Sequence, residues 1–341
     1  MELKKPLLGL TLTELQAITQ EHSMPTFAAK QIADWIYRKR VTSIEEMSNL
    51  SLGDRQKLCE HYEIGAKKYQ HLYASVDGTK KYLFATTKGN GIESALIPHE
   101  NHYTLCVSTQ VGCKMGCLFC MTGKQGFQGQ LSTNEIINQI YSIDESEQLT
   151  NIVYMGMGEP LDNYSETIKS IEIMTADYAY AWSPKRITVS TVGVIPTLIR
   201  FLEESKCNLA VSLHSPFDEE RLQLMPIQNV YPIKEVIQVL KAQKNQARIS
   251  FEYILFAGVN DSQKHVNELA RLLNGLSAHI NLMRFHAIPN SPLKGTSEEK
   301  LKEFQSALNK KGIITTIRAS RGEDIMAACG LLSTLQKQGS A

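Results

Sequence analysis

The sequence has almost no net charge and no long apolar run. Lysine and arginine total 36 against 35 aspartate and glutamate residues, which gives a formal net charge of +1. The chain therefore lacks the global basic signature of many nucleic-acid-binding proteins. No apolar stretch approaches the ~18 residues that a membrane span requires, and polar Thr11 and Thr13 interrupt the N-terminal apolar residues before they reach the length of a signal peptide. We expect a soluble, cytoplasmic protein with no membrane partner.

The sequence also lacks a framework of paired cysteines. Four of its seven cysteines are scattered without disulfide-like spacing, namely Cys59, Cys106, Cys207 and Cys329. This arrangement favours a reducing compartment. Taken singly, each of the four is most simply a small buried hydrophobic residue.

The other three cysteines lie within eight residues, as Cys113, Cys117 and Cys120, with Phe119 just before the last one. Structural zinc usually takes four protein ligands, and so does a fully ligated 4Fe–4S cluster. A cluster held by three thiolates keeps one iron open, and an open iron can bind a substrate. A zinc knuckle completed by a distant His or Cys is the alternative that this loop alone leaves open.

The first hundred residues contain helical signals followed by strand signals. Capping-box-like starts at Thr11, Ser43 and Ser51 predict a small helical unit over residues 1–64. From residue 65 the pattern changes to strands, with a hairpin turn at Asp77-Gly78.

From residue 103 onwards, predicted strands alternate with predicted helices, which implies a parallel sheet with right-handed crossovers. The strands are expected at 105–108, 151–155, 186–190, 208–213, 249–254, 279–283 and 313–317. About six repeats predict an α/β fold with an incomplete (β/α)6 barrel rather than a closed eightfold one. We divide the chain into a helical accessory domain (1–64), a β-hairpin extension (65–102), the partial barrel (103–335) and a C-terminal tail (336–341).

Glycine and polar residues follow several of these strands. They form the segments 156–160, 190–193, 212–214 and 284–286. In parallel α/β folds ligands bind at the carboxyl ends of the strands. Each segment is weak evidence alone, but four of them on one rim beside a three-cysteine loop predict a cofactor pocket.

The chain as a whole resembles the RlmN/Cfr family of radical S-adenosylmethionine (SAM) RNA methyltransferases, and within it the RlmN branch, which acts on adenine C2. The likeness runs nearly end to end, through the segments 30–37, 77–84, 92–98, 110–113, 155–160, 212–214 and 321–330. The cluster loop alone is typical of the whole radical SAM superfamily. The second cysteine pair, Cys106 and Cys329, is typical of this family.

The resemblance implies a role for five cysteines. Cys113, Cys117 and Cys120 would hold a 4Fe–4S cluster whose open iron binds SAM. One SAM would methylate Cys329, and a second would be cleaved to a 5′-deoxyadenosyl radical that removes hydrogen from that methyl group. The carbon radical would add to adenine C2, and Cys106 would resolve the protein–RNA crosslink through a transient disulfide with Cys329.

The resemblance also implies a base and a set of SAM contacts. Glu93 is the expected proton acceptor, although its alternation with apolar neighbours on a strand would by itself indicate a solvated edge residue. The family commonly has an Asn at the last SAM contact, where this chain has His286, which can donate and accept hydrogen bonds. The remaining expected SAM contacts are Gly158, Glu159, Ser190, Ser212, Leu213 and His214.

The implied substrates are 23S rRNA at the peptidyl-transferase centre and tRNA at the adenosine 3′ to the anticodon. Adenine C2 is an electrophilic carbon without a nucleophilic lone pair, so ordinary methyl transfer fails there and radical chemistry is needed. The other expected partners are a flavodoxin-like or other one-electron donor and a disulfide reductant, and we expect a monomer. Candidate phosphate contacts on the hairpin region are Lys67, Lys68, Lys80 and Lys81.

Two alternatives remain. The sister branch of the family methylates adenine C8 with the same cysteines, and only the hairpin at Asp77 favours the C2 branch. The other alternative is a non-catalytic, zinc-bound RNA-binding module.

Overall fold

The computed structural model describes residues 4–243 and 248–334 and contains a large central sheet. Residue 335 and the predicted tail 336–341 lie outside the described residues. One part of the sheet is entirely parallel. Its strands are β6 (His102–Cys106), β9 (Asn151–Tyr154), β10 (Ile187–Thr191), β11 (Asn208–Ser212), β12 (Ile249–Leu255), β13 (Ala278–Arg284) and β14 (Ile314–Ile317).

Helices alternate with these strands, as the sequence predicts. They are α4 (Met121–Gln125), α5 (Thr133–Tyr141), α6 (Tyr164–Thr175), α7 (Ile195–Glu204), α8 (Asp218–Leu224), α9 (Ile233–Ala242), α10 (Gln263–Leu273) and α11 (Glu298–Lys310). Helix α5 shows why they form: Ser132 and Glu135 make a capping box at its start, and Ile136, Ile137 and Ile140 place an apolar face against the sheet.

The other part of the sheet is antiparallel. Strands β3 (His71–Ala74), β4 (Lys80–Ala85) and β5 (Gly91–His99) follow one another, and β5 pairs with β6. The predicted hairpin at Asp77-Gly78 joins β3 to β4. The order across the sheet is β14-β13-β12-β11-β10-β9-β6-β5-β4-β3, so within the described residues the parallel strands do not close on themselves. The expected incomplete barrel is confirmed.

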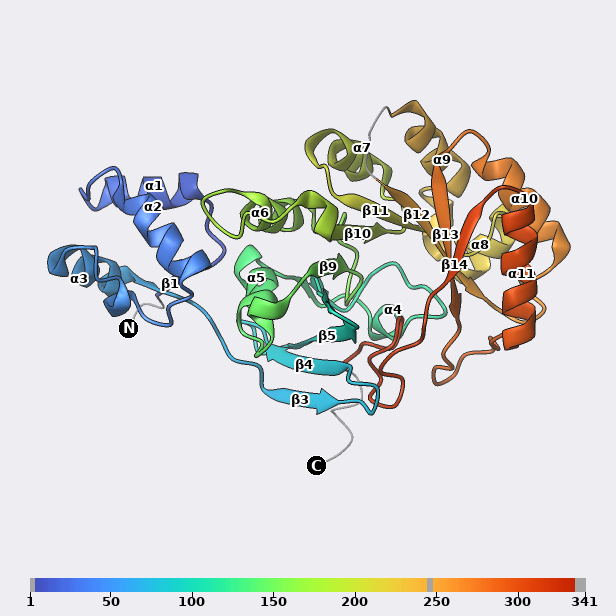
Figure 1. The fold of residues 1–341 in the computed structure, drawn as a ribbon, viewed down its shortest axis with the longest axis horizontal. Coiled ribbons are helices and arrows are strands. Elements are labelled where there is room, and N and C mark those ends of the chain that lie inside the picture. Colours follow the sequence, from blue (N-terminus) through green and yellow to red (C-terminus); the bar gives the residue numbers. More distant parts are fainter. Residues whose placement is uncertain (1–3, 244–247, 335–341) are drawn as a thin grey trace.

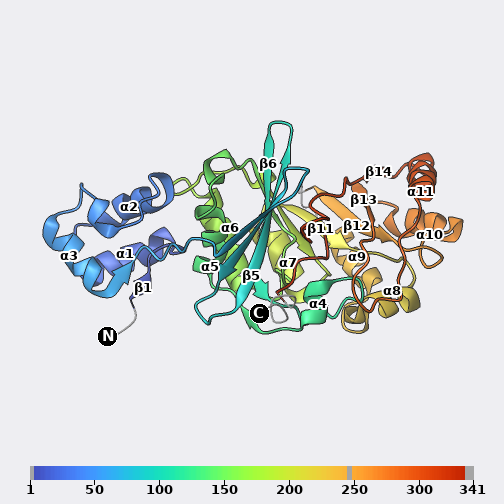
Figure 2. The same cartoon turned by 90° about the horizontal axis from the view of Figure 1, so that it is seen from below.

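The N-terminal helices form a unit beside the barrel. This unit contains β1 (Lys5–Pro6), α1 (Leu12–Glu21), α2 (Ala28–Ala33), a π-helical turn (Asp34–Arg38), a 3-10 turn (Ile44–Glu46), α3 (Leu52–His61) and β2 (Tyr62–Glu63). Side-chain caps form at Thr11, Ser43 and Ser51, as predicted. Figures 1 and 2 show this unit at one end of an elongated molecule, with α10 and α11 at the other end.

Two basic residues join this unit to the barrel. Arg38 donates to the carbonyl oxygens of Asp177 and Ala179, and Arg40 donates to that of Tyr141. The sequence suggests a helix-dipole role for the basic segment 38–40, and the structure adds a role in docking.

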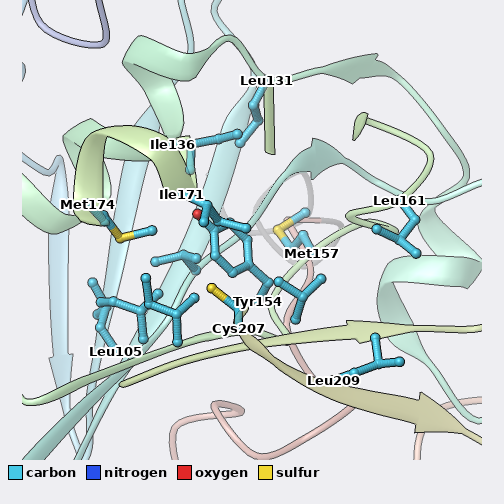
Figure 3. Packing of buried hydrophobic residues seen from close by; sticks show 14 of the residues in the cluster. Leu105, Leu131, Ile136, Tyr154, Met157, Leu161, Ile171, Met174, Cys207 and Leu209 are labelled. Atoms are coloured by element: carbon cyan, nitrogen blue, oxygen red, sulfur yellow. The ribbon is translucent and has the colours of Figure 1, made fainter. Parts of the chain in front are cut away.

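A continuous apolar core lies between the sheet and its covering helices. Tyr154 of β9 lies at its centre, wholly buried, and its hydroxyl bonds to Ser170 of α6 at 2.6 Å. Figure 3 shows Leu105, Met174 and Cys207 around this tyrosine. Cys207 is thus a core residue, as expected. No helix in the described ranges is both long and apolar enough to cross a membrane.

Candidate active site

The three clustered cysteines lie on a tight loop closed by two short strands. Strands β7 (Gln110–Val111) and β8 (Gly129–Gln130) pair antiparallel on either side of it. The loop turns at Gly112 and Gly116, which have φ angles of +69° and +66°. A Cβ at Gly112 would lie 1.7 Å from the carbonyl oxygen of Gly126, so only glycine fits there.

The thiols of Cys113, Cys117 and Cys120 face one pocket, which we call the cluster pocket. Burial raises the pKa of Cys113 to about 12 and that of Cys117 well above its usual value, and Cys120 adds to both shifts. Buried thiols that raise each other's pKa favour a metal centre, which binds the thiolate form and compensates its charge. The donor set therefore fits an iron–sulfur cluster. The other lining residues include Tyr154, Gly158, Glu159, Ser190, Ser212, His214 and Glu252.

The same side chains do not form a site for a single metal ion. Across residues 4–243 and 248–334, no three His, Cys, Asp or Glu side chains converge closely enough to hold one ion. A structural zinc site needs four such ligands at bonding distance.

The aromatic residue before the last cysteine packs against a buried histidine. The ring of Phe119 lies 4.6 Å from the ring of His214 and 5.7 Å from that of Phe256. The Nδ1 atom of His214 accepts the backbone N–H of Ile254 at 3.0 Å, and burial, with Arg221, lowers the pKa of His214 to about 3. The imidazole is therefore neutral, with its hydrogen on Nε2.

Gly158 and Glu159 lie on the loop after β9 and face the cluster pocket. Gly158 has φ +98°, and a Cβ there would lie 2.5 Å from Cβ of Gln110. The carboxylate of Glu159 accepts the backbone N–H groups of Leu161 at 3.1 Å and Val192 at 3.0 Å. Burial raises the pKa of Glu159 to about 7. This carboxylate suits an amino group as partner.

Ser190 lies one residue before the end of β10, and Ser212 ends β11. Both line the same pocket, whereas the Leu213 side chain is wholly buried. The guanidinium of Arg221, also wholly buried, joins the two strand ends. It donates to the carbonyl oxygens of Val192 at 3.0 Å, Ser212 at 3.0 Å and Leu213 at 3.1 Å. Arg221 therefore fixes the shape of the pocket rim at the ends of β10 and β11, although Arg221 itself lies behind this rim.

Cys106 and Cys329 meet in a second pocket, the cysteine-pair pocket. Cys106 is buried on β6 and Cys329 is exposed on a loop near the C-terminus, and both line this pocket with Ala327 and Arg318. Burial, with a contribution from Cys329, raises the pKa of Cys106 to about 12, while Arg318 opposes the shift. The two pockets adjoin: Cys120, Met155, Gly156, Met283, Arg318, Cys329 and Gly330 line both.

Glu93 is buried rather than solvated, with only 1% of its surface exposed. The indication of an edge residue from its local pattern is therefore wrong, because the loop that carries Cys329 covers this face of β5. One carboxylate oxygen accepts the backbone N–H of Ser333 at 3.1 Å, and the other lies 3.2 Å from Nζ of Lys81.

His286 does not lie with the other expected SAM contacts. It lines the cysteine-pair pocket but not the cluster pocket. Its Nε2 bonds to the Ser320 hydroxyl at 2.6 Å, and its Nδ1 lies 3.2 Å from the Glu323 carboxylate. As a SAM contact, His286 stays a prediction that this geometry does not support.

The four candidate phosphate contacts differ in exposure. Lys67 and Lys68 are exposed, and Lys80 is partly exposed and pairs with Glu145. Lys81 is only 8% exposed and points at Glu93. Its prediction as a surface phosphate contact is wrong, because the pleat turns it to the face that the Cys329 loop covers.

Arg221 and Arg318 are site residues that the sequence reasoning missed. Arg318 follows β14 directly, so the rule that ligand-binding residues follow parallel strands would have found it. It donates to Glu252 at 3.5 Å and to the sulfur of Met155 at 3.4 Å. Nothing in the local pattern around Arg221 indicates its burial.

Two family models match the chain. Residues 5–64 match the ribosomal RNA large subunit methyltransferase N-terminal domain, and residues 107–273 match the radical SAM superfamily.

Full-length relatives agree with these matches. The chain is 56% identical over 333 residues to the probable dual-specificity RNA methyltransferase RlmN of Parabacteroides distasonis, covering 97% of each chain. It is 41% identical over 330 residues to the dual-specificity RNA methyltransferase RlmN of Syntrophus aciditrophicus, covering 95% of each. Among solved structures, a radical SAM methyltransferase from Sphaerobacter thermophilus superposes with a TM-score of 0.91 at 38% identity, covering 96% of this chain and 98% of that chain.

Proposed function

Since this chain belongs to the RlmN family of radical SAM RNA methyltransferases, we propose that it methylates C2 of an adenosine. The proposed targets are an adenosine of 23S rRNA at the peptidyl-transferase centre and the adenosine 3′ to the anticodon in tRNA. The words "dual-specificity" in the names of the relatives support two RNA substrates. The chain is a SAM-dependent RNA methyltransferase whose cofactors are a 4Fe–4S cluster and SAM.

The observation that supports this function most strongly is the contact between the two pockets. Cys329 lines both of them, whereas Cys106 lines only the cysteine-pair pocket. A thiol in this position can receive a methyl group from one side and pass its carbon to a base on the other side. Cys106 is close enough to form a disulfide with Cys329 afterwards, which releases the carbon from the Cys329 sulfur.

The residues of the cluster pocket are proposed to bind the cofactors. Cys113, Cys117 and Cys120 would ligate the cluster, and Glu159 would accept hydrogen bonds from the amino group of SAM. When bound, the cluster and SAM supply a methyl cation equivalent and, with one external electron, a carbon radical that removes a hydrogen atom from a methyl group. The other proposed SAM contacts are Gly158, Ser190, Ser212, Leu213, His214 and, from the adjoining cysteine-pair pocket, His286.

The cysteine pair is proposed to carry the transferred carbon. Cys329 sulfur takes the methyl group, which becomes a methylene radical and bonds to adenine C2. The ring would regain its aromaticity when the C2 proton passes to Glu93 and one electron passes to the oxidised cluster, which would recover the electron spent in cleaving SAM. The Cys106 thiolate then attacks Cys329 sulfur: an S–S bond forms, the S–CH2 bond breaks, and its electron pair takes up a proton to give the methyl product.

This cycle requires further partners. The disulfide between Cys106 and Cys329 is oxidised by two electrons relative to the two thiols, so a thiol reductant has to restore it. A flavodoxin-like or similar protein is the proposed one-electron donor. Both requirements favour a reducing, cytoplasmic location, and we propose a monomer because the two pockets are built from one chain.

The product nucleoside tests this proposal. Anaerobically reconstituted enzyme is incubated with SAM, reductant and unmodified tRNA or 23S rRNA fragment, and the digested RNA is analysed by mass spectrometry. We expect 2-methyladenosine from both RNAs. An 8-methyladenosine product would assign the chain to the sister branch, and no methylated adenosine would contradict the proposal.

A further inference from the structure

The loop that carries Cys329, residues 321–334, is held on both sides of the cysteine. Upstream, the Asp77 carboxylate accepts the backbone N–H of Gly322 at 2.9 Å, and the Ser75 hydroxyl donates to the Asp324 carboxylate at 2.6 Å. Both contacts come from the turn between β3 and β4. They fix the backbone that enters the cysteine-pair pocket.

Downstream of Cys329, the same loop is held by Glu93 of β5. Its carboxylate accepts the N–H of Ser333 at 3.1 Å. The hydroxyl of Thr122, at the start of α4, donates to the Leu332 carbonyl at 2.6 Å. The proposed proton acceptor is therefore also a structural partner of the loop that brings Cys329 to the substrate.

Lys81 is the side chain that connects these two sides. Its Nζ lies 3.2 Å from the Glu93 carboxylate and 3.4 Å from the carbonyl oxygen of Met326, three residues before Cys329. Its side chain is 10% exposed and that of Glu93 only 1%. Buried lysines are rare unless they are paired, and a buried ion pair is by itself weak evidence for a role in stability.

We propose that Lys81 is a positioning residue for the methylation step: it holds the Glu93 carboxylate ionised and in place, and it aligns the Cys329 loop with that carboxylate. This inference rests on the proposed function of Glu93 as the proton acceptor. A neighbouring ammonium favours the charged form of a buried carboxylate, so Glu93 begins each cycle as a base. Without the ammonium, the buried Glu93 carboxylate would be protonated more readily and would then be unable to accept the proton from adenine C2.

Other titratable groups share this surrounding. Tyr73 on β3 lies under the Lys81 ammonium, 5.2 Å from ring centroid to Nζ. Cys106 on β6 is on the same face as Glu93, because its register partner on β5 is Ala95, two residues from Glu93. On the covering loop the titratable groups are Arg321, Glu323, Asp324 and Cys329.

The test compares Lys81→Met with Lys80→Met in reconstituted holoenzyme. Lys80 precedes Lys81 on β4, faces the opposite side of the strand and pairs with Glu145, so it is a matched control. Enzyme already methylated on Cys329 is given tRNA in single turnovers over a range of pH. We expect Lys81→Met to slow RNA methylation at least about tenfold. In the plot of rate against pH, we expect its acidic limb to shift to higher pH by about one unit or more. Cys329 methylation and iron content should stay unchanged. Lys80→Met should keep the wild-type limb. Because Lys80 is a candidate phosphate contact, the turnovers use saturating tRNA, so that a loss of RNA affinity does not change the rate.

A second variant shows whether Lys81 acts through Glu93. In a Glu93→Gln background there is no carboxylate to position, so adding Lys81→Met should cost little further activity. Lys81→Arg keeps the positive charge and should keep the wild-type acidic limb. This variant still tests the proposal if Lys81→Met does not fold. An unmoved limb in Lys81→Met, or the same fold-loss with and without Glu93, would overturn the proposal.

Hydrogen exchange separates this inference from the proposed function. The Ser333 amide should exchange at least about tenfold faster in Lys81→Met than in wild type or Lys80→Met, whether or not the RNA is methylated. Wild-type enzyme that makes no methylated adenosine would contradict the proposed function. Ser333 exchange at the wild-type rate in Lys81→Met would contradict the positioning role.

Discussion

Nδ1 of His214 accepts the backbone N–H of Ile254 at 3.0 Å, and this bond requires a neutral imidazole. His214 is 2% exposed and lies at the end of β11, between the ring of Phe119 and strand β12. Its backbone has φ +54°, a conformation that Asn tolerates better than most residues. This histidine is thus part of the wall of the cluster pocket.

His214 predicts a specific loss of stability in acid. Burial lowers its pKa to about 3, whereas an unfolded histidine titrates near 6.5. The neutral His214 therefore makes its full contribution to the free energy of unfolding above about pH 6.5, and this contribution is lost as the pH falls toward 3. At about pH 5 the free energy of unfolding is lower by about 2 kcal/mol. Urea unfolding of cluster-free protein measures this loss. The variant His214→Asn should lack this part of the pH dependence, the exposed control His102→Asn should keep it, and an equal loss in both variants would contradict the account.

Gly158→Ala should destabilise the loop after β9 and abolish SAM binding. The new Cβ would lie 2.5 Å from the Gln110 side chain and would also occupy a positive-φ position. Positive φ costs about 1–2 kcal/mol, and overpacking adds about 1–3 kcal/mol. Gly258→Ala is the control, because its φ is +71° with nothing within 4 Å of the added Cβ. Equal unfolding free energies for the two variants would contradict the steric argument.

Arg221→Met should weaken both folding and SAM binding although Arg221 lies behind the pocket wall. It would leave the carbonyl oxygens of Val192, Ser212 and Leu213 without their buried donor, at a cost of about 3 kcal/mol or more. Arg200→Met, which removes an exposed pair with Glu204, should change stability by less than about 1 kcal/mol. Chemical unfolding and SAM titration measure both effects. Wild-type SAM affinity in Arg221→Met would show that the rim does not depend on this guanidinium.

Cys106→Ala should trap the enzyme on its RNA. The crosslink from Cys329 to adenine would form but would lack the thiol that resolves it, and a protein–RNA species would survive denaturing electrophoresis. Cys329→Ala should form no crosslink and no methylated protein while keeping its iron. Cys59→Ala, whose thiol lies in the N-terminal unit beside Glu45, should turn over normally. Normal turnover in Cys106→Ala would remove its resolving role.

The cluster loop could be predicted from the sequence because all of its information is local. Cys113, Cys117 and Cys120 lie within eight residues, and the glycines beside them indicate a tight turn. The parallel strands were equally accessible, since apolar runs and capping residues are local signals too. The pocket followed from topology, because carboxyl ends of parallel strands meet at one edge.

The positions of Lys81, Glu93 and Arg221 were not accessible in this way. Glu93 alternates with apolar neighbours on its strand, a pattern that usually indicates a solvated face, and Lys81 follows another lysine near the start of β4, which also suggests a solvated position. They are buried only because the loop 321–334 packs over β4 and β5, a contact between segments far apart in the chain. The burial of a basic side chain such as Arg221 depends on where distant carbonyl groups lie, and the local hydrophobic periodicity of the sequence does not predict their positions. The pairing of Cys106 with Cys329 came from the family resemblance for the same reason.

The most direct test of the central claim, transfer of carbon through Cys329, uses SAM with a CD3 methyl group. Reconstituted enzyme, freed of any methyl group already on Cys329, is turned over with unmodified tRNA, and the 2-methyladenosine is analysed by mass spectrometry. We predict a methyl group with two deuterons and one hydrogen, because one deuteron is removed while the carbon is bound to Cys329 and a solvent-derived proton replaces it. A methyl group that retains all three deuterons would mean direct transfer from SAM and would contradict the roles proposed for Cys329 and Cys106.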